Sequence, residues 1–179
     1  MKTLAGPLYA AIIPGRKKNV QNKIVLITGA GSGLGRELAI KFAESGAITI
    51  LWDKNETTVK QTAEMIEEII DSNHHPIKQT AWFVVDVRDE NQVAQAANKL
   101  RNQFGDVDIL VNNAGIAPCE PFKNLTSETI REIFDVNIMA HFWTVKQFLP
   151  AMEKNNCGHI VAIASSAGIM ASPYFTAYG

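Results

Sequence analysis

The chain has 179 residues, of which 46% are hydrophobic and 20% are charged, and 17 Lys and Arg residues nearly balance 18 Asp and Glu residues for a net charge of -1. This size and composition are typical of one folded domain, which excludes a disordered chain and a long coiled coil. The absence of a cationic excess argues against nucleic acid as a partner. Because Cys119 and Cys157 have no metal-ligand spacing with the four histidines, we predict no metal site and a reducing compartment.

The first 22 residues form a leader that precedes the predicted domain. Residues 4–13 are apolar and are followed by a Pro-Gly pair and three cations at residues 16–18. Ten residues are too few to span a bilayer as a helix, which takes about 20. We expect an anchor that lies in the membrane interface with its cations facing anionic lipid; a leader without a membrane role is the alternative. A cleaved signal peptide is less well supported, because no A-x-A pattern follows.

From residue 23 onward, short apolar runs alternate with amphipathic stretches, which is the pattern of β-α-β units around a parallel sheet. The runs are apolar throughout because helices cover both faces of such a sheet. We therefore predict that residues 23–179 form one α/β domain, a Rossmann-like doubly wound parallel sheet of about five strands with helices on both faces and strand order 3-2-1-4-5. The predicted strands are residues 24–28, 48–52, 82–85, 109–112 and 159–164.

Apolar residues at helical spacing predict helices between these strands. One helix follows the loop after the first strand, and two others have apolar positions at 59, 63, 66 and 70 and at 93, 97, 100 and 104. A longer helical stretch spans residues 127–154, in which Pro150 predicts a bend or an end. Its predicted buried positions are Ile130, Phe134, Ile138, Val145 and Met152.

A glycine-rich loop joins the first strand to the first helix, with the sequence T-G-A-G-S-G-L-G from Thr28 to Gly35. Glycine lets the backbone approach a pyrophosphate closely, and the N-terminus of the following helix presents free N–H groups to the anion. The loop follows a strand, opens an amphipathic helix and has an acid downstream, which is the context that a dinucleotide site needs. A glycine-rich turn without a ligand is the alternative.

The downstream acid is Asp53, which directly follows the second predicted strand. Its carboxylate can accept hydrogen bonds from the hydroxyls of an adenosine ribose and would repel a 2′-phosphate, so we predict NAD as the cofactor. NADP is the alternative, because Lys54 and Arg36 are cations near this position. A solvated or helix-capping role for Asp53 also stays open.

These residues resemble the short-chain dehydrogenase/reductase family, and the match extends over residues 24–178. The family's T-G-x-x-x-G-x-G pattern is complete from Thr28 to Gly35, an Asp-Val pair follows the third strand, and an N-N-A-G motif stands at residues 112–115. The resemblance implies a nicotinamide dinucleotide with its adenine beside the Asp-Val pair. Together with Asp53, the implied cofactor-binding residues are Gly29, Ser32, Gly33, Leu34, Gly35, Asp86, Val87 and Asn112.

The same resemblance implies three catalytic residues: Asn137 in the long helix, Ser165 after the fifth strand, and Tyr178. Hydride transfer to a carbonyl builds negative charge on oxygen, so a phenol must donate a proton while a second hydroxyl holds that oxygen in place. We expect Tyr178 to be the acid/base, Ser165 to be the orienting donor and Asn137 to hold a water of the proton relay. For Asn137, an amide with structural hydrogen bonds only is the alternative.

In the family a lysine follows the tyrosine four residues later, a position past Gly179. A nearby cation lowers the pKa of a tyrosine from about 10 toward working pH. We therefore expect a chain without this lysine to be impaired in the acid/base step, and to expose its fifth strand as an apolar sheet edge that favours association. The alternative function is a non-catalytic nucleotide-binding chain that depends on a longer homologue as its partner.

Several short stretches resemble membrane-associated retinol and hydroxysteroid dehydrogenases, among them residues 14–20, 51–53, 141–144 and 148–152. This resemblance implies a small lipophilic alcohol or ketone as substrate. It also implies residence at the endoplasmic reticulum membrane or lipid droplets, with the cytoplasm as the alternative. Because the family usually pairs through the long helix and the helix that would follow Tyr178, we expect a homodimer or pairing with a longer homologue.

Overall fold

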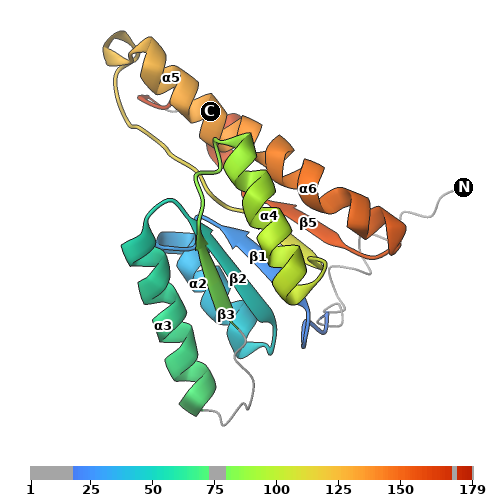
Figure 1. The fold of residues 1–179 in the computed structure, drawn as a ribbon. Coiled ribbons are helices and arrows are strands. Elements are labelled where there is room, and N and C mark those ends of the chain that lie inside the picture. The colour runs from blue at the N-terminus through green and yellow to red at the C-terminus, as the bar shows by residue number, and fades with distance from the viewer. Residues whose placement is uncertain (1–17, 73–79, 171–172, 179) are drawn as a thin grey trace, which may run out of the picture.

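The computed structural model describes residues 18–72, 80–170 and 173–178. Its five strands form one parallel sheet with the order β3-β2-β1-β4-β5, as Figure 1 shows. The predicted strand order is therefore confirmed. The strands are β1 (Ile24–Thr28), β2 (Ile48–Asp53), β3 (Thr80–Val84), β4 (Ile109–Asn112) and β5 (His159–Ala162).

The helices are α2 (Gly33–Glu44), α3 (Glu56–Ser72), α4 (Glu90–Phe104), α5 (Ser127–Phe134) and α6 (Ala140–Lys154). Four of them, α2, α3, α4 and α6, pack on the two faces of the sheet. A π-helical turn, η2 (Asp135–Met139), joins α5 to α6, and the short 3₁₀ turns are η1 (Phe122–Asn124) and η3 (Ser166–Gly168).

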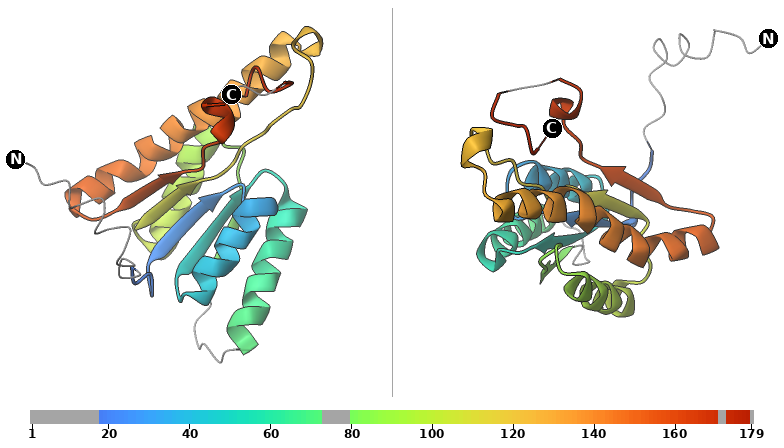
Figure 2. Two further views of the ribbon diagram at one scale, coloured as in Figure 1. Left: turned by 180° about the vertical axis from the view of Figure 1, so that it is seen from behind. Right: turned by 90° about the horizontal axis from the view of Figure 1, so that it is seen from above.

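The sheet separates two hydrophobic clusters, which confirms that the fold is doubly wound. On one face Leu26 and Trp52 pack with α4 and α6, and on the other Ile27 and Leu51 pack with α2 and α3. Figure 2 shows these two helix layers from behind and from above. Because successive side chains of a strand point to opposite faces, a strand covered on both sides is apolar at every position. This explains why all five residues of β1 are buried.

The strand order reverses next to β1, which pairs with β2 on one side and with β4 on the other. The chain therefore leaves β1 and β4 toward different faces of the sheet, and a crevice forms at the carboxyl ends of these strands. The glycine-rich loop begins at the last residue of β1, and the N-N-A-G motif begins at the last residue of β4. The topology thus brings both motifs to one edge of the sheet.

The predicted long helix differs from the structure in its buried face. Met152 is buried as predicted, but Phe134 and Ile138 are 53% and 49% exposed, so that part of the prediction was wrong. Ile133 and Val136 are buried instead. Both sides of this stretch carry apolar residues, so spacing by itself does not identify the inner side. The helix also does not end at Pro150, because α6 continues to Lys154.

Three strands also differ from the prediction at their ends, since β2 ends at Asp53, β3 spans Thr80–Val84 and β5 ends at Ala162. The predicted membrane anchor falls almost entirely on residues 1–17, which lie outside the described residues. In the part of the chain that the structure describes, no helix is both long enough and apolar enough to cross a bilayer.

Candidate functional site

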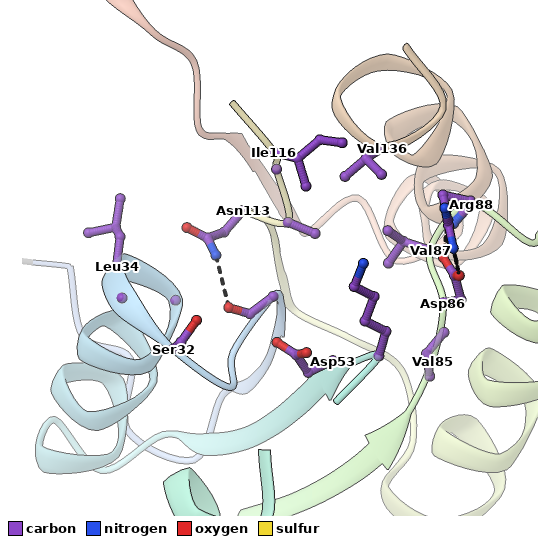
Figure 3. Close-up of a pocket in the computed structure, with 16 residues that line it drawn as sticks. Ser32, Leu34, Asp53, Val85, Asp86, Val87, Arg88, Asn113, Ile116 and Val136 are labelled. Carbon is purple, nitrogen blue, oxygen red and sulfur yellow. Dashed lines mark hydrogen bonds and ion pairs between the residues drawn. The ribbon is translucent and has the colours of Figure 1, made fainter. Parts of the chain in front are cut away.

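A cleft of about 380 Å³ opens at the carboxyl ends of the strands. Its walls are the glycine-rich loop, the last residue of β2, the loop after β3, the segment after β4 and Val136 of η2, as Figure 3 shows. Sequence motifs that are far apart in the chain therefore face one volume. The predicted cofactor-binding residues that line it are Gly29, Ser32, Gly33, Leu34, Gly35, Asp53, Asp86 and Val87.

Asn112, the remaining predicted cofactor residue, does not line this cleft. Its side chain is buried, and its Oδ1 accepts a hydrogen bond of 2.8 Å from the Thr144 hydroxyl, which fastens β4 to α6. The next residue, Asn113, lines the cleft instead, and its Nδ2 donates to the carbonyl oxygens of Thr28 and Gly29 at 2.9 and 3.2 Å. Strand alternation explains the difference, because neighbouring residues point to opposite sides.

The buried hydroxyl of Thr28 links the glycine-rich loop to the N-N-A-G motif. It accepts hydrogen bonds of 3.0 Å from the backbone N–H groups of Asn113 and Ala114. Together with the Asn113 side chain, these bonds hold the start of the glycine-rich loop against the segment after β4. These bonds fix the position of the loop relative to the sheet.

The glycine loop has no room for side chains at its closest approaches. A Cβ on Gly35 would overlap the carbonyl oxygen of Gly29, and Gly29 itself has a φ of 65°, a conformation that favours glycine. Helix α2 can therefore begin directly against the loop. Its first turn, which includes Leu34, lines the cleft.

The N-terminus of α2 is suited to an anion. Its N-cap Ser32 makes no side-chain capping bond, and its first turn has no acidic residue. By contrast, α4 and α5 begin with the capping side chains of Asp89 and Thr126, and both have a glutamate in the first turn. The free N–H groups and the helix dipole at the start of α2 thus face the cleft uncompensated, which fits a pyrophosphate.

Asp53 ends β2, lines the cleft and contacts the glycine loop directly. Its Oδ2 accepts the backbone N–H of Gly31 at 2.9 Å, and its Oδ1 accepts the N–H of Asn55 at 2.9 Å. Helix α3 is capped by the Asn55 side chain, which accepts from the N–H of Thr58, so the capping alternative does not describe Asp53. Lys54 also lines the cleft, whereas Arg36 does not.

Arg88 is a residue of the cleft that the sequence prediction missed. Its guanidinium Nη2 lies 2.6 Å from Oδ2 of Asp86 and its Nη1 lies 2.7 Å from Oε1 of Glu132 on α5. The hydrogen bonds from Arg88, together with the charges of Arg88 and Lys54, keep the pKa of Asp86 below its ordinary value of 3.8. An arginine two positions after the Asp of the Asp-Val pair was the available signal, because that spacing lets it reach back within the same loop.

Replacing Arg88 by Met should lower the free energy of unfolding at pH 7 by about 1 kcal/mol, because Asp86 and Glu132 each lose a partly exposed ion pair. The pKa of Asp86 is depressed in the folded chain, so this stabilisation is present above the unfolded pKa and fades as the pH falls below about 4. Chemical denaturation should show a difference from wild type that shrinks toward acid. A difference that grows toward acid would contradict this assignment.

Asn137 lies in the π-helical turn and holds the backbone of Ile116. Its Oδ1 accepts the N–H of Ile116 and its Nδ2 donates to the carbonyl oxygen of Ile116, both at 2.9 Å. The structure therefore shows the backbone hydrogen bonds that a purely structural role for Asn137 requires. The role in a proton relay stays a prediction, and one that is compatible with π turns being frequent at functional sites.

Ser165 and Tyr178 both lie in the segment after β5. The exposed Ser165 is the N-cap of η3, and its Oγ accepts the N–H of Ala167 at 3.1 Å. The ring of the half-buried Tyr178 packs against Phe175 with a centroid distance of 5.7 Å. Among the contacts of the described residues, no hydrogen bond joins Ser165 to Tyr178, so their catalytic pairing stays a prediction.

Comparison with known proteins gives one family and several relatives. The model of the family described as short chain dehydrogenase matches residues 23–179. Short-chain dehydrogenase/reductase family 16C member 6 of Bos taurus is 44% identical over 96% of this chain and 55% of its own length. Epidermal retinol dehydrogenase 2 of Homo sapiens is 43% identical over 93% and 52%, and estradiol 17-beta-dehydrogenase 11 of Mus musculus is 43% identical over 96% and 55%. The chain spans about half the length of these curated relatives.

Solved structures share the fold. An NAD+-bound xylitol dehydrogenase is 29% identical, with a TM-score of 0.81 over 90% of this chain and 60% of that protein. A metagenomic short-chain oxidoreductase in complex with NADP is 24% identical, with a TM-score of 0.80 over 90% of this chain and 70% of that protein. Both likenesses agree with the Rossmann-like arrangement of the sheet.

Proposed function

Since the chain belongs to the short-chain dehydrogenase family, we propose that it binds NAD and interconverts an alcohol and its carbonyl. The observation that carries this proposal is the cleft in which the uncapped start of α2, the glycine loop and Asp53 face one volume. When bound, a nicotinamide dinucleotide supplies or accepts the hydride. The named relatives are dehydrogenases, so the non-catalytic alternative is not favoured.

Different residues of the cleft bind different parts of the dinucleotide in this proposal. The first N–H groups of α2, at Gly33 and Leu34, hold the pyrophosphate. Asp53 accepts hydrogen bonds from the hydroxyls of the adenosine ribose and repels a 2′-phosphate, which favours NAD over NADP. Asp86 and Val87, which follow β3, contact the adenine. The assignment is supported by the fact that these residues all line one cleft.

The acid/base chemistry belongs to the segment after β5. Tyr178 donates its phenolic proton to the carbonyl oxygen during reduction and takes it back during oxidation, while the Ser165 hydroxyl holds that oxygen. Asn137 keeps a relay water near η2. The names of the relatives support a small lipophilic alcohol or ketone, such as a retinoid or a steroid, as the substrate.

The proposed lipophilic substrate leads to a proposal for the surroundings of the protein. We place it at the endoplasmic reticulum membrane or lipid droplets, where a lipophilic substrate concentrates, with peripheral contact through the N-terminal cations. We also propose a homodimer, because α5, η2 and α6 expose the apolar side chains of Phe134, Ile138, Phe142 and Leu149.

A binding and turnover experiment tests the function. The full chain is titrated with NADH by fluorescence, and then incubated with NAD and a panel that includes all-trans-retinol, estradiol and ethanol. We expect saturable NADH binding and NADH formation with a lipophilic alcohol but not with ethanol. A chain that binds neither NADH nor NADPH would overturn the proposal.

Replacing Asp53 by Ala should weaken NADH binding by about 10-fold or more, because hydrogen bonds to a charged acceptor contribute about 1.5–3 kcal/mol. NADPH binding should fall less or improve, because the variant removes repulsion of the 2′-phosphate. The two dissociation constants are compared with those of Asp71→Ala, which alters an exposed acid on α3. Equal losses for both cofactors would contradict the role of Asp53.

A further inference from the structure

The peptide groups of Gly31 are held from two sides. Its N–H donates to Oδ2 of Asp53 at 2.9 Å, and its carbonyl oxygen accepts from Nη2 of Arg36 at 2.5 Å. Gly31 is buried, and a Cβ at this position would lie 2.9 Å from Oδ2 of Asp53. The orientation of this peptide and the position of the Asp53 carboxylate are therefore linked.

Arg36 is itself fixed by a second element. Its Nε donates to the hydroxyl of Thr62 on α3 at 3.0 Å, and this fully buried hydroxyl donates to the carbonyl oxygen of Thr58 at 3.1 Å. The planar guanidinium thus has one acceptor on the glycine loop and one on α3. Because Arg36 does not line the cleft, its side chain is not placed to meet a 2′-phosphate.

We propose that Arg36 is a positioning residue for the discrimination between NAD and NADP. Held in place by Thr62, it fixes the peptide of Gly31, and this peptide orients the carboxylate of Asp53. This inference rests on the proposed function. Asp53 is oriented by two backbone N–H groups, those of Gly31 and Asn55. If the Gly31 peptide can rotate, one of these two bonds is lost, and the carboxylate can turn away from the ribose and from a 2′-phosphate alike.

Three variants separate this role from a simple loss of charge. Arg36→Met removes both hydrogen bonds, whereas Thr62→Val removes the buried anchor and leaves every charge in place. Arg36→Lys keeps the charge without the two-pronged geometry. Thr57→Val is the matched control, because Thr57 is an exposed residue of the same helix. Each is made in the full chain, and the dissociation constants of NADH and NADPH are measured by fluorescence titration together with the Tm.

The readout is the ratio of NADPH to NADH dissociation constants. We expect Arg36→Met to reduce this ratio by about threefold to tenfold, and Thr62→Val by about twofold to threefold, because an orienting hydrogen bond is lost. Arg36→Lys should restore part of the ratio, and Thr57→Val should leave it unchanged. A merely structural role would lower the Tm without moving the ratio.

Three outcomes would overturn the inference. An unchanged ratio in folded Thr62→Val and Arg36 variants would leave Arg36 a purely structural residue. A ratio that rises in Arg36→Met would mean that the guanidinium contacts the 2′-phosphate directly. A wild-type chain that binds neither cofactor would overturn the proposed function as well. A wild-type chain that prefers NADH, with variants that prefer it equally, would overturn only the role of Arg36.

Discussion

Replacing Tyr178 by Phe should lower kcat by about 10²- to 10⁴-fold while leaving the NADH dissociation constant within about twofold, because the variant removes only the proton that a general acid supplies. The ring can keep its packing against Phe175, so folding should be little affected. Steady-state rates with a lipophilic alcohol and fluorescence titration with NADH, both on the full chain, check the two halves of the prediction.

Tyr174→Phe is the matched control for this experiment. Tyr174 is exposed, and its backbone carbonyl oxygen accepts the N–H of Glu120. The control variant should therefore keep both turnover and NADH binding. Full turnover in Tyr178→Phe would refute the acid/base role, and loss of turnover in both variants would point to the segment rather than to the phenol.

Replacing Gly35 by Ala should weaken NADH binding by at least about 10-fold and lower the free energy of unfolding by about 1–3 kcal/mol, because the added methyl group overfills a packed contact. The new Cβ would overlap the carbonyl oxygen of Gly29 and lie 2.5 Å from Nδ2 of Asn113. Either the loop or the start of α2 must move, and both hold the pyrophosphate in the proposed complex. NADH titration and chemical denaturation measure the two effects.

Gly168→Ala provides the comparison for the glycine loop. A Cβ on Gly168 would meet no atom within 4 Å, and this residue lies in η3, away from the cleft. NADH affinity and stability should therefore stay close to wild type in this variant. If Gly35→Ala behaves in the same way, the close approach of backbone in the glycine loop is not what the cofactor requires.

The sequence by itself was sufficient for the sheet and for most of the cleft, and the reason is local. A strand buried on both faces must be apolar at every position, so β1 and β4 could be predicted with their observed ends. The glycine pattern and Asp53 stand at the carboxyl ends of predicted strands. Parallel strands bring all their carboxyl ends to one edge of the sheet. Eight of the nine predicted cofactor residues therefore line one cleft.

The tertiary structure decided what depends on partners distant in sequence. It turned Asn112 toward Thr144 and Asn113 toward the glycine loop, exposed Phe134 and Ile138, and committed Arg36 to Gly31 and Thr62. The sequence of one segment shows which side chains are polar or apolar and at what spacing the apolar ones recur. Which neighbour satisfies it is set by packing of the sheet against its helices, because a hydrogen bond or a buried face exists only once two elements meet.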